Sequence, residues 1–93
     1  MKLVWTRPAQ NDLAQIDWFL SEHDPGAADI SARLALKAGR FIAENPRIGS
    51  AIDIELRKWP VRGSPYLLIY RVTADAVEIL RVRHEREDWR PLP

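Results

Sequence analysis

The hydrophobic pattern of this 93-residue chain changes once, near Asn45 and Pro46, and this change limits the folds that it can adopt. Before it, apolar residues recur every three or four positions, as in amphipathic helices. After it, they are contiguous or alternate, as in strands. Asn45 followed by Pro46 ends the helical part, because the residue before a proline is disfavoured in the α region. The sequence therefore predicts helices followed by strands in one α+β domain.

The first half of the chain divides into a short opening strand and two helices. We expect a short strand over Lys2–Thr6, a first helix over Pro8–Glu22 and a second helix over Pro25–Glu44. Thr6 can cap the first helix and Asp24 the second, which begins at a proline whose missing N–H costs nothing there. Helices joined by so short a turn lie antiparallel, as a hairpin. The apolar face of the second helix is expected to contain Ile30, Leu34, Phe41 and Ile42.

The remaining residues predict three strands. These strands cover Ile54–Trp59, Tyr66–Val72 and Val77–Arg83, with turns at Pro60–Pro65 and Thr73–Ala76. The middle strand is almost wholly apolar, aromatic or β-branched, which indicates burial on both faces. The predicted fold is β-α-α-β-β-β, with the helical hairpin packed on one face of a small, mostly antiparallel four-stranded sheet. Residues 1–93 form a single domain, because so short a chain cannot build two cores.

The composition argues against several kinds of site. The chain has no cysteine, and its two histidines are far apart, so no metal site is expected. A Gly-rich phosphate loop is missing, and no cofactor is expected. With a formal charge of +1, the protein does not coat nucleic acid by bulk charge. No apolar run approaches the roughly 18 residues of a membrane helix, so we expect a cytoplasmic location without membrane contact.

Arginines of the last strand are the first candidates for binding. If Leu80 and Val82 face the helices, alternation places Arg81 and Arg83 together on the open face, within reach of one anion. An equally good interpretation is a solvated face on which these arginines pair with acids. His84 follows directly and can transfer protons near neutral pH, although a lone histidine at a strand end is more often a surface residue.

Four tryptophans are many for so short a chain. They can fill the core, which a small domain needs. Trp18, however, lies off the apolar stripe of the first helix, and Trp59 shares a strand face with charged residues. Exposed aromatic residues beside arginines are typical of protein interfaces. A protein partner is therefore indicated.

Several segments of the chain together carry a resemblance to a known family. They are Trp5–Ala9, Asp12-Leu13, Asn45–Gly49, Glu55–Arg57, Tyr66–Arg71, Val77–His84, Arg86 and Asp88-Trp89. In this order and spacing, and nearly end to end, they resemble the RelE/ParE superfamily of toxins from type II toxin–antitoxin systems. This resemblance implies a toxin that is neutralised by a small antitoxin, whose C-terminal segment wraps the toxin surface. Because the antitoxin often represses the shared operon, contact with operator DNA is expected only through the antitoxin.

The two branches of the superfamily differ in target. RelE-like members are ribosome-dependent mRNA endoribonucleases that work without metal, and ParE-like members poison DNA gyrase. An RNA-cleaving member would use Arg62, Arg81 and His84 here. No tyrosine follows Tyr70, however, and Trp89 cannot exchange protons usefully. Acidic residues near the end of the chain would also repel RNA, so we favour a gyrase inhibitor without catalytic activity of its own.

A third hypothesis is an interaction module that has lost toxicity. In every case the expected contacts with antitoxin or target are arginines, tryptophans and their neighbours. They are Trp18, Arg57, Lys58, Trp59, Arg62, Arg81, Arg83, His84 and Trp89.

Overall fold

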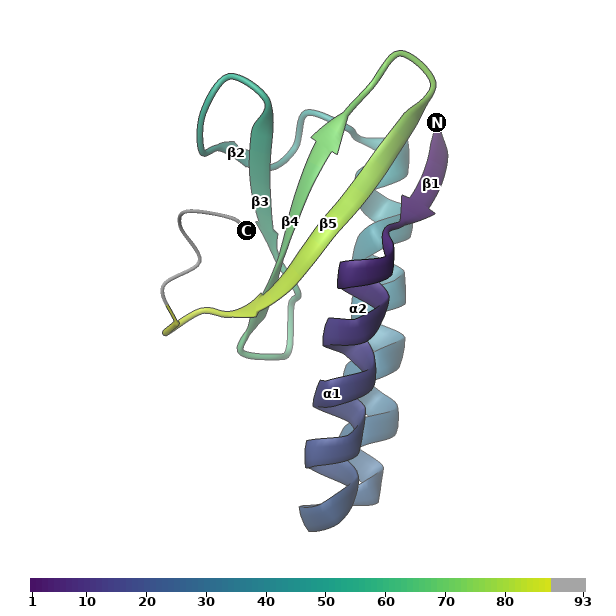
Figure 1. The fold of residues 1–93 in the computed structure, drawn as a ribbon, viewed down its shortest axis with the longest axis vertical. Helices are drawn as coiled ribbons and strands as arrows, with labels where there is room; N and C mark the ends of the chain where they lie inside the picture. The colour runs from purple at the N-terminus through teal and green to yellow at the C-terminus, as the bar shows by residue number, and fades with distance from the viewer. Residues whose placement is uncertain (88–93) are drawn as a thin grey trace.

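The structure, a computed structural model, describes residues 1–87. The two predicted helices and all four predicted strands are present, and a short further strand follows the second helix (Figure 1). The elements are β1 (Lys2–Trp5), α1 (Arg7–His23), α2 (Pro25–Glu44), β2 (Ser50–Ala51), β3 (Leu56–Pro60), β4 (Tyr66–Val72) and β5 (Ala76–His84).

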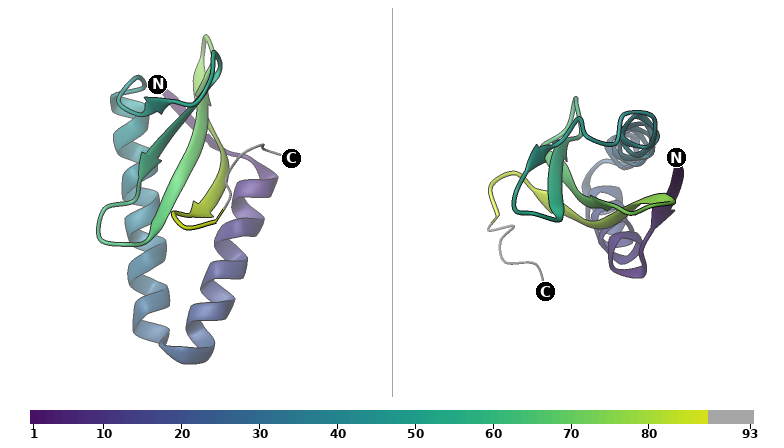
Figure 2. Two further views of the ribbon diagram at one scale, coloured as in Figure 1. Left: turned by 90° about the vertical axis from the view of Figure 1, so that its left-hand side faces the viewer. Right: turned by 90° about the horizontal axis from the view of Figure 1, so that it is seen from above.

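The sheet has five strands in the order β1-β5-β4-β3-β2, so the prediction of four strands is wrong by one. The additional strand, β2, pairs antiparallel with Arg57 and Lys58 of β3 over only two residues, which is too short to produce a periodic pattern. Only β1 runs parallel to its neighbour, β5. The predicted α+β architecture, with a hairpin on one face of a mostly antiparallel sheet, is confirmed (Figure 2).

Both predicted helix caps are confirmed. Thr6 Oγ1 accepts a hydrogen bond from Ala9 N at 3.3 Å, and Asp24 Oδ1 accepts one from Ala27 N at 3.2 Å. These bonds satisfy backbone donors that would otherwise lack a partner in the first helical turn. The second helix has the predicted bounds, and the first is one residue longer at each end.

The start of β3 was predicted two residues too early. The segment before Leu56 is a turn, in which the Asp53 carboxylate accepts from the backbone nitrogens of Glu55 and Leu56 at 2.8 and 2.9 Å. An aspartate that bonds to backbone a few residues ahead stabilises a turn in place of a strand. Ile54 is consequently fully exposed, and β3 continues one residue further, to Pro60.

The core lies between the hairpin and the sheet. Its buried members are Ala9, Ala38, Ile42, Val61, Leu68, Tyr70, Val77, Ile79 and Val82. Small residues let α2 approach the sheet closely. A Cβ atom added at Gly39 would lie 2.7 Å from the Trp5 ring. The central strand β4 is buried from Leu67 to Tyr70, as expected of a strand covered on both faces.

The hairpin is longer than the sheet and extends past its end (Figures 1 and 2). The molecule accordingly measures 39 Å along its longest axis, against 25 and 22 Å across. Two predicted members of the buried face of α2, Ile30 and Phe41, are exposed. Ile30 lies in the projecting part of α2, and Phe41 borders an open groove.

Candidate functional site

A bulge in β5 changes which residues of this strand face the helices. Tyr70 pairs with Ile79, but Ile69 pairs with Arg81, so Leu80 is an extra residue in β5. The prediction that Leu80 faces the core is thus wrong, because Ile79 and Val82 take the buried positions. Arg81 pairs with Ile69 and Arg83 with Leu67, so both arginines lie on the sheet face opposite to that of Val82. The bulge, however, gives them different surroundings.

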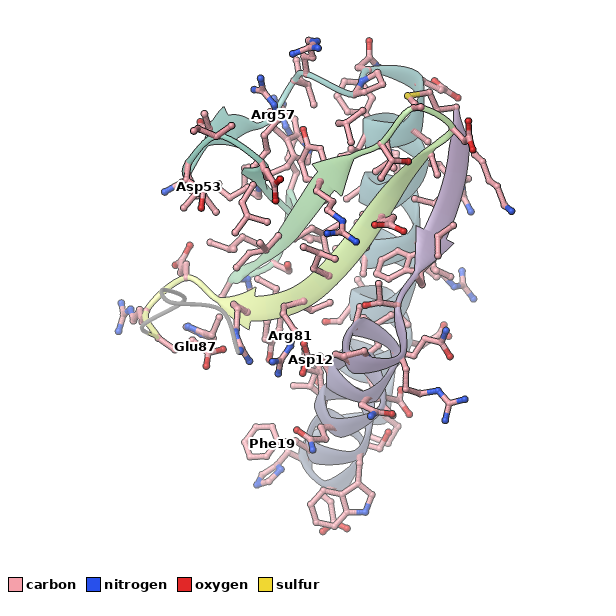
Figure 3. The ribbon with its side chains drawn as sticks, turned by 45° about the horizontal axis from the view of Figure 1, so that its top comes forward. Asp12, Phe19, Asp53, Arg57, Arg81 and Glu87 are labelled. Carbon is pink, nitrogen blue, oxygen red and sulfur yellow. The ribbon has the colours of Figure 1, made fainter. Side chains whose placement is uncertain are left out.

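Arg81 is held by an acid of the first helix. Its Nε and Nη2 atoms donate to the two carboxylate oxygens of Asp12 at 2.8 and 2.9 Å (Figure 3). The same carboxylate accepts from Val82 N at 2.9 Å. The side chains are 19% and 10% exposed, and the hydrogen bond to Asp12 raises the pKa of the Arg81 guanidinium. This fork-shaped pair ties α1 to β5, so Arg81 is not an open anion receptor.

Arg83 borders a cleft instead. Its Nε atom is buried and makes no hydrogen bond in the described part of the chain. The cleft has a volume of about 220 Å³ and lies between α1 and the end of β5, where Gln15, Phe19, Tyr66 and Glu87 also line it. A buried guanidinium nitrogen without a partner favours a ligand that accepts a hydrogen bond. Arg83, unlike Arg81, is available to such a ligand.

His84 ends β5 beside Tyr66, the first residue of β4. The two rings meet edge to face with centroids 5.5 Å apart. Nδ1 of His84 accepts from Arg86 N at 3.1 Å, and its backbone nitrogen donates to Glu87 Oε1 at 2.7 Å. The histidine therefore helps to hold the turn after β5, and one of its two ring nitrogens is occupied.

An aromatic groove separates α2 from the turn after β3. Phe41 stacks on Trp59 with centroids 5.7 Å apart, and the Arg62 guanidinium lies 5.8 Å from the Trp59 ring. The groove has a volume of about 320 Å³, and Leu34, Lys37, Ala38 and Pro60 complete its lining. Trp59 is half-buried and packs on the core, so the groove has an apolar floor and two cations at its rim. Such a surface suits an amphipathic, acidic peptide segment.

Arg57 of β3 holds the loop that follows α2. The Nη1 atom of Arg57 donates to Gly49 O at 2.7 Å. Tyr70 Oη donates to Pro46 O at 2.8 Å and accepts from Gly49 N at 2.9 Å. Burial raises the pKa of the Tyr70 phenol, and the hydrogen bond from Gly49 N and the charge of Arg57 lower this pKa in part. Lys58, the next residue, is half-buried in β3. Arg57 therefore has a structural role, which the sequence did not indicate.

The predicted contact residues fall into separate groups. Trp59 and Arg62 meet at the groove beside α2. Arg81, Arg83 and His84 lie on β5, which β4 separates from β3 and Trp59. Trp18 stands apart on α1 and is 68% exposed. Trp89 lies outside the described residues.

Two important residues were missed by sequence reasoning. Asp12 occupies the apolar stripe of α1, three residues after Ala9 and four before Ile16, and an acid on a buried stripe indicates an ion pair. Its partner could not be found without the bulge in β5. Phe41 was recognised as apolar but was placed in the core, whereas it stacks on Trp59 in the open aromatic groove.

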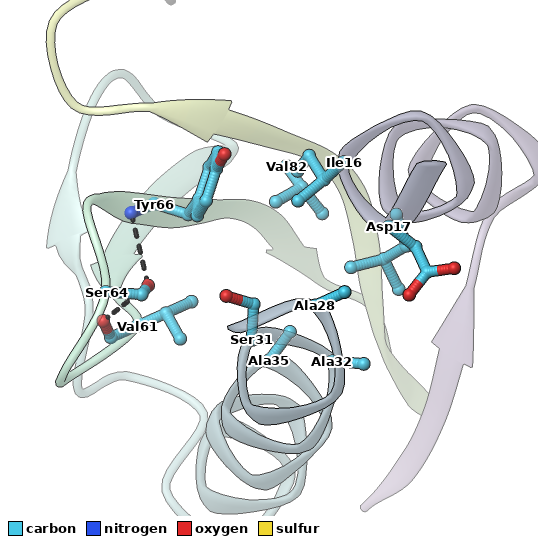
Figure 4. Close-up of a pocket in the computed structure, with 11 residues that line it drawn as sticks. Ile16, Asp17, Ala28, Ser31, Ala32, Ala35, Val61, Ser64, Tyr66 and Val82 are labelled. Carbon is cyan, nitrogen blue, oxygen red and sulfur yellow. Dashed lines mark hydrogen bonds between the residues drawn. The ribbon is translucent and has the colours of Figure 1, made fainter. Parts of the chain in front are cut away.

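A small further hollow lies beneath the hairpin (Figure 4). It encloses only about 20 Å³ between Ala28, Ala35 and Val61, and Ser64 lines it while bonded to Val61 O at 3.0 Å. This is room for one water molecule at most, so it is a packing gap. Residues 1–87 contain no group of three or more potential metal ligands, and none of their helices is long and apolar enough to span a membrane.

The fold and these surfaces define a small α+β protein-binding domain. Residues 3–89 match the family model described as the ParE toxin of the type II toxin–antitoxin system parDE. The chain belongs to this family and is thus a toxin of a type II toxin–antitoxin system within the RelE/ParE superfamily, with a cognate antitoxin as its partner.

Individual relatives agree with this assignment. The chain is 34% identical over 90 residues to Toxin RelE3 of Caulobacter vibrioides, covering 94% of this chain and 98% of the relative. Its fold is similar to a solved chain of the chromosomal ParDE system from P. aeruginosa, with a TM-score of 0.79 and 23% identity. That likeness covers 90% of this chain and 95% of the other.

Proposed function

We propose that this toxin inhibits DNA gyrase in the cytoplasm and that its antitoxin neutralises it by covering the aromatic groove. The observation that carries the choice of gyrase is the ion pair between Asp12 and Arg81. RNA cleavage requires cations that are free to stabilise negative charge on the reacting phosphate. Arg81 donates two hydrogen bonds to Asp12. If a phosphate took the place of Asp12, the ion pair that links α1 to β5 would be lost.

The groove supports the antitoxin's place in this proposal. Its stacked Phe41 and Trp59 rings supply an apolar floor, and Lys37 and Arg62 supply positive charge at the rim. Aromatic anchors flanked by charged residues are the usual centres of binding energy in interfaces. Operator DNA contacts the complex through the antitoxin in this proposal.

The experiment is a pair of assays on the purified toxin. We expect inhibition of gyrase supercoiling or accumulation of cleaved DNA complexes, and no cleavage of ribosome-bound mRNA. Replacing Arg83 by alanine should weaken the effect on gyrase without unfolding the protein, because the Arg83 Nε atom has no protein partner to lose. Cleavage of mRNA with unaffected gyrase would overturn the proposal.

A ribosome-dependent endoribonuclease is the second candidate. The contact between Tyr66 and His84 favours it, because two groups able to exchange protons lie together near Arg83. In that case His84→Ala should slow cleavage by about a hundredfold or more. For a gyrase inhibitor the same substitution removes one surface contact, and its effect should be several-fold at most.

A further inference from the structure

The outer end of the helical hairpin differs from the rest of the molecule in charge. Residues 17–30, here called the hairpin tip, contain four acids, Asp17, Glu22, Asp24 and Asp29, and no lysine or arginine. The whole chain has a formal charge of +1, so the remainder is distinctly positive. Of the four acids, only Asp29 forms a salt bridge among the described residues, with Arg33 at 2.9 Å.

The hairpin tip also exposes large apolar side chains. Trp18 is 68% exposed, Phe19 is 55% exposed and Ile30 on α2 is 58% exposed. Phe19 projects from α1 (Figure 3), lines the edge of the Arg83 cleft and contacts the His23 ring, with centroids 5.0 Å apart. Trp18 and Phe19 lie three or four residues before Glu22, so the three side chains share one face of α1.

This surface is not required by the fold. The hairpin tip projects past the end of the sheet, so its outer side chains have no second layer to pack against (Figures 1 and 2). Single exposed apolar residues are ordinary, but two neighbouring aromatic residues on one projecting face are typical of an interface. The aromatic groove is lined by other residues, so a protein seated there does not by itself cover this face.

The charge of the hairpin tip limits what can bind to it. An acidic surface repels the phosphate backbone of RNA and DNA. It complements a basic surface, and a protein that binds DNA must present basic surface to the phosphates. Aromatic side chains next to the acids supply the apolar contacts that such a complex needs.

We propose that the hairpin tip docks on a basic, DNA-binding surface of gyrase, with Trp18 and Phe19 as apolar anchors and Glu22 as a charge contact. This inference rests on the proposed function, because it identifies the toxin surface that gyrase meets. The antitoxin groove and the target-binding face are then two separate surfaces of one toxin. Docking here places an acidic, aromatic projection where DNA phosphates would otherwise lie.

Binding of the purified toxin to purified gyrase tests the inference. The double variant Trp18→Ala/Phe19→Ala should bind about 30-fold more weakly or worse, as expected for the loss of central anchors. Glu22→Lys should weaken binding about tenfold at low salt and less at high salt, because screening reduces charge contacts. A positive charge near the C-terminal end of α1 interacts favourably with the helix dipole, so this variant should fold.

Matched controls lie at the other end of the molecule. Ile48→Ala/Ile54→Ala removes two exposed apolar side chains, and Glu44→Lys reverses one exposed charge at the end of α2. These variants should bind gyrase as the unmodified toxin does, and circular dichroism checks that all variants are folded.

The outcomes separate the two proposals. If the unmodified toxin binds gyrase and the tip variants bind it equally well, the inference is wrong and the proposed function stands. If the unmodified toxin does not bind gyrase, both are wrong. Binding to purified 70S ribosomes that the tip variants abolish, with gyrase ignored, would likewise overturn both.

Discussion

At the scale of single residues, the Asp12 carboxylate decides what the arginines of β5 can do. It accepts three hydrogen bonds, two from Arg81 and one from Val82 N. Alternation along a strand predicts that neighbouring arginines have similar environments. They do not, because Arg81 lies opposite an acid on α1, while the Arg83 Nε atom has no partner among residues 1–87. A loss of toxicity in Arg81 variants would therefore reflect a less stable fold, and it would not by itself show that Arg81 contacts a target.

Breaking the Asp12–Arg81 pair should destabilise the fold. We expect Asp12→Ala to lower the free energy of unfolding by about 2–3 kcal/mol, because it leaves the half-buried Arg81 guanidinium without its partner. This value lies between those typical of exposed and of buried ion pairs. Arg81→Ala should cost a similar amount. The double variant should cost clearly less than the sum, since each single change already removes the shared interaction. Urea unfolding of the four proteins measures this, and simple additivity would contradict it.

Tyr70 should make stability depend on alkaline pH. Its pKa is raised from 10.0 by burial, so the folded state holds the phenol proton more tightly than the unfolded state. The resulting stability is fully present below pH 10 and is lost as pH rises through the folded-state pKa. Tyr70→Phe should lower stability at neutral pH by roughly 1–3 kcal/mol, because Gly49 N and Pro46 O lose their partner.

The same substitution should also flatten the decline of stability above pH 10. Thermal melts from pH 8 to 11 compare the two proteins. Tyr66→Phe is the control, since Tyr66 is only half-buried. An unchanged alkaline decline in Tyr70→Phe would show that another group causes it.

At the scale of elements, the helices were predicted better than the strands that flank them. Helix bounds follow from local signals, namely the caps at Thr6 and Asp24 and the break at Asn45-Pro46, which the sequence shows directly. The bulge in β5 and the two-residue strand β2 depend on pairing with residues far along the chain. Local periodicity carries no information on such pairing, so the partner of Arg81 and the loop-holding role of Arg57 could not be predicted.

Two glycines of α2 offer a matched test of how closely the elements pack. Alanine normally stabilises a helix by about 1 kcal/mol relative to glycine. At Gly26 the added Cβ meets only Asp24 Oδ1, at 3.4 Å, so Gly26→Ala should raise stability by up to that amount. At Gly39 it would lie 2.7 Å from the Trp5 ring, and the packing of α2 on β1 must give way.

Gly39→Ala should therefore lower the melting temperature, whereas Gly26→Ala should raise or preserve it. The net cost at Gly39 is expected to be about 1–3 kcal/mol, as for other overpacked core positions. Thermal unfolding of both variants provides the comparison. A stabilising Gly39→Ala would mean that α2 and β1 adjust to the extra methyl group without loss.

At the scale of the whole molecule, this toxin consists of a small core, an aromatic groove beside α2 and a hairpin that projects past the sheet (Figure 1). A chain of 93 residues buries a modest share of its surface, so its stability should be low without a partner. The resemblance indicated the class of partner from the sequence, but the groove proposed as the antitoxin site forms where Phe41 of α2 stacks on Trp59 of β3. This contact depends on how the layers assemble and has no local sequence signal.

Antitoxin binding should stabilise the toxin by mass action, because the ligand binds the folded state only. At a free antitoxin concentration 1,000 times Kd, the gain is about 4 kcal/mol. If the groove is the antitoxin site, Phe41→Ala should reduce the antitoxin-induced rise in Tm, whereas Leu36→Ala should not. Both side chains lie on α2 with nearly equal exposure, 42% and 43%, but only Phe41 lines the groove. Equal rises in Tm for both variants would place the antitoxin elsewhere on the toxin, because the lost groove contact would then have had no share in binding.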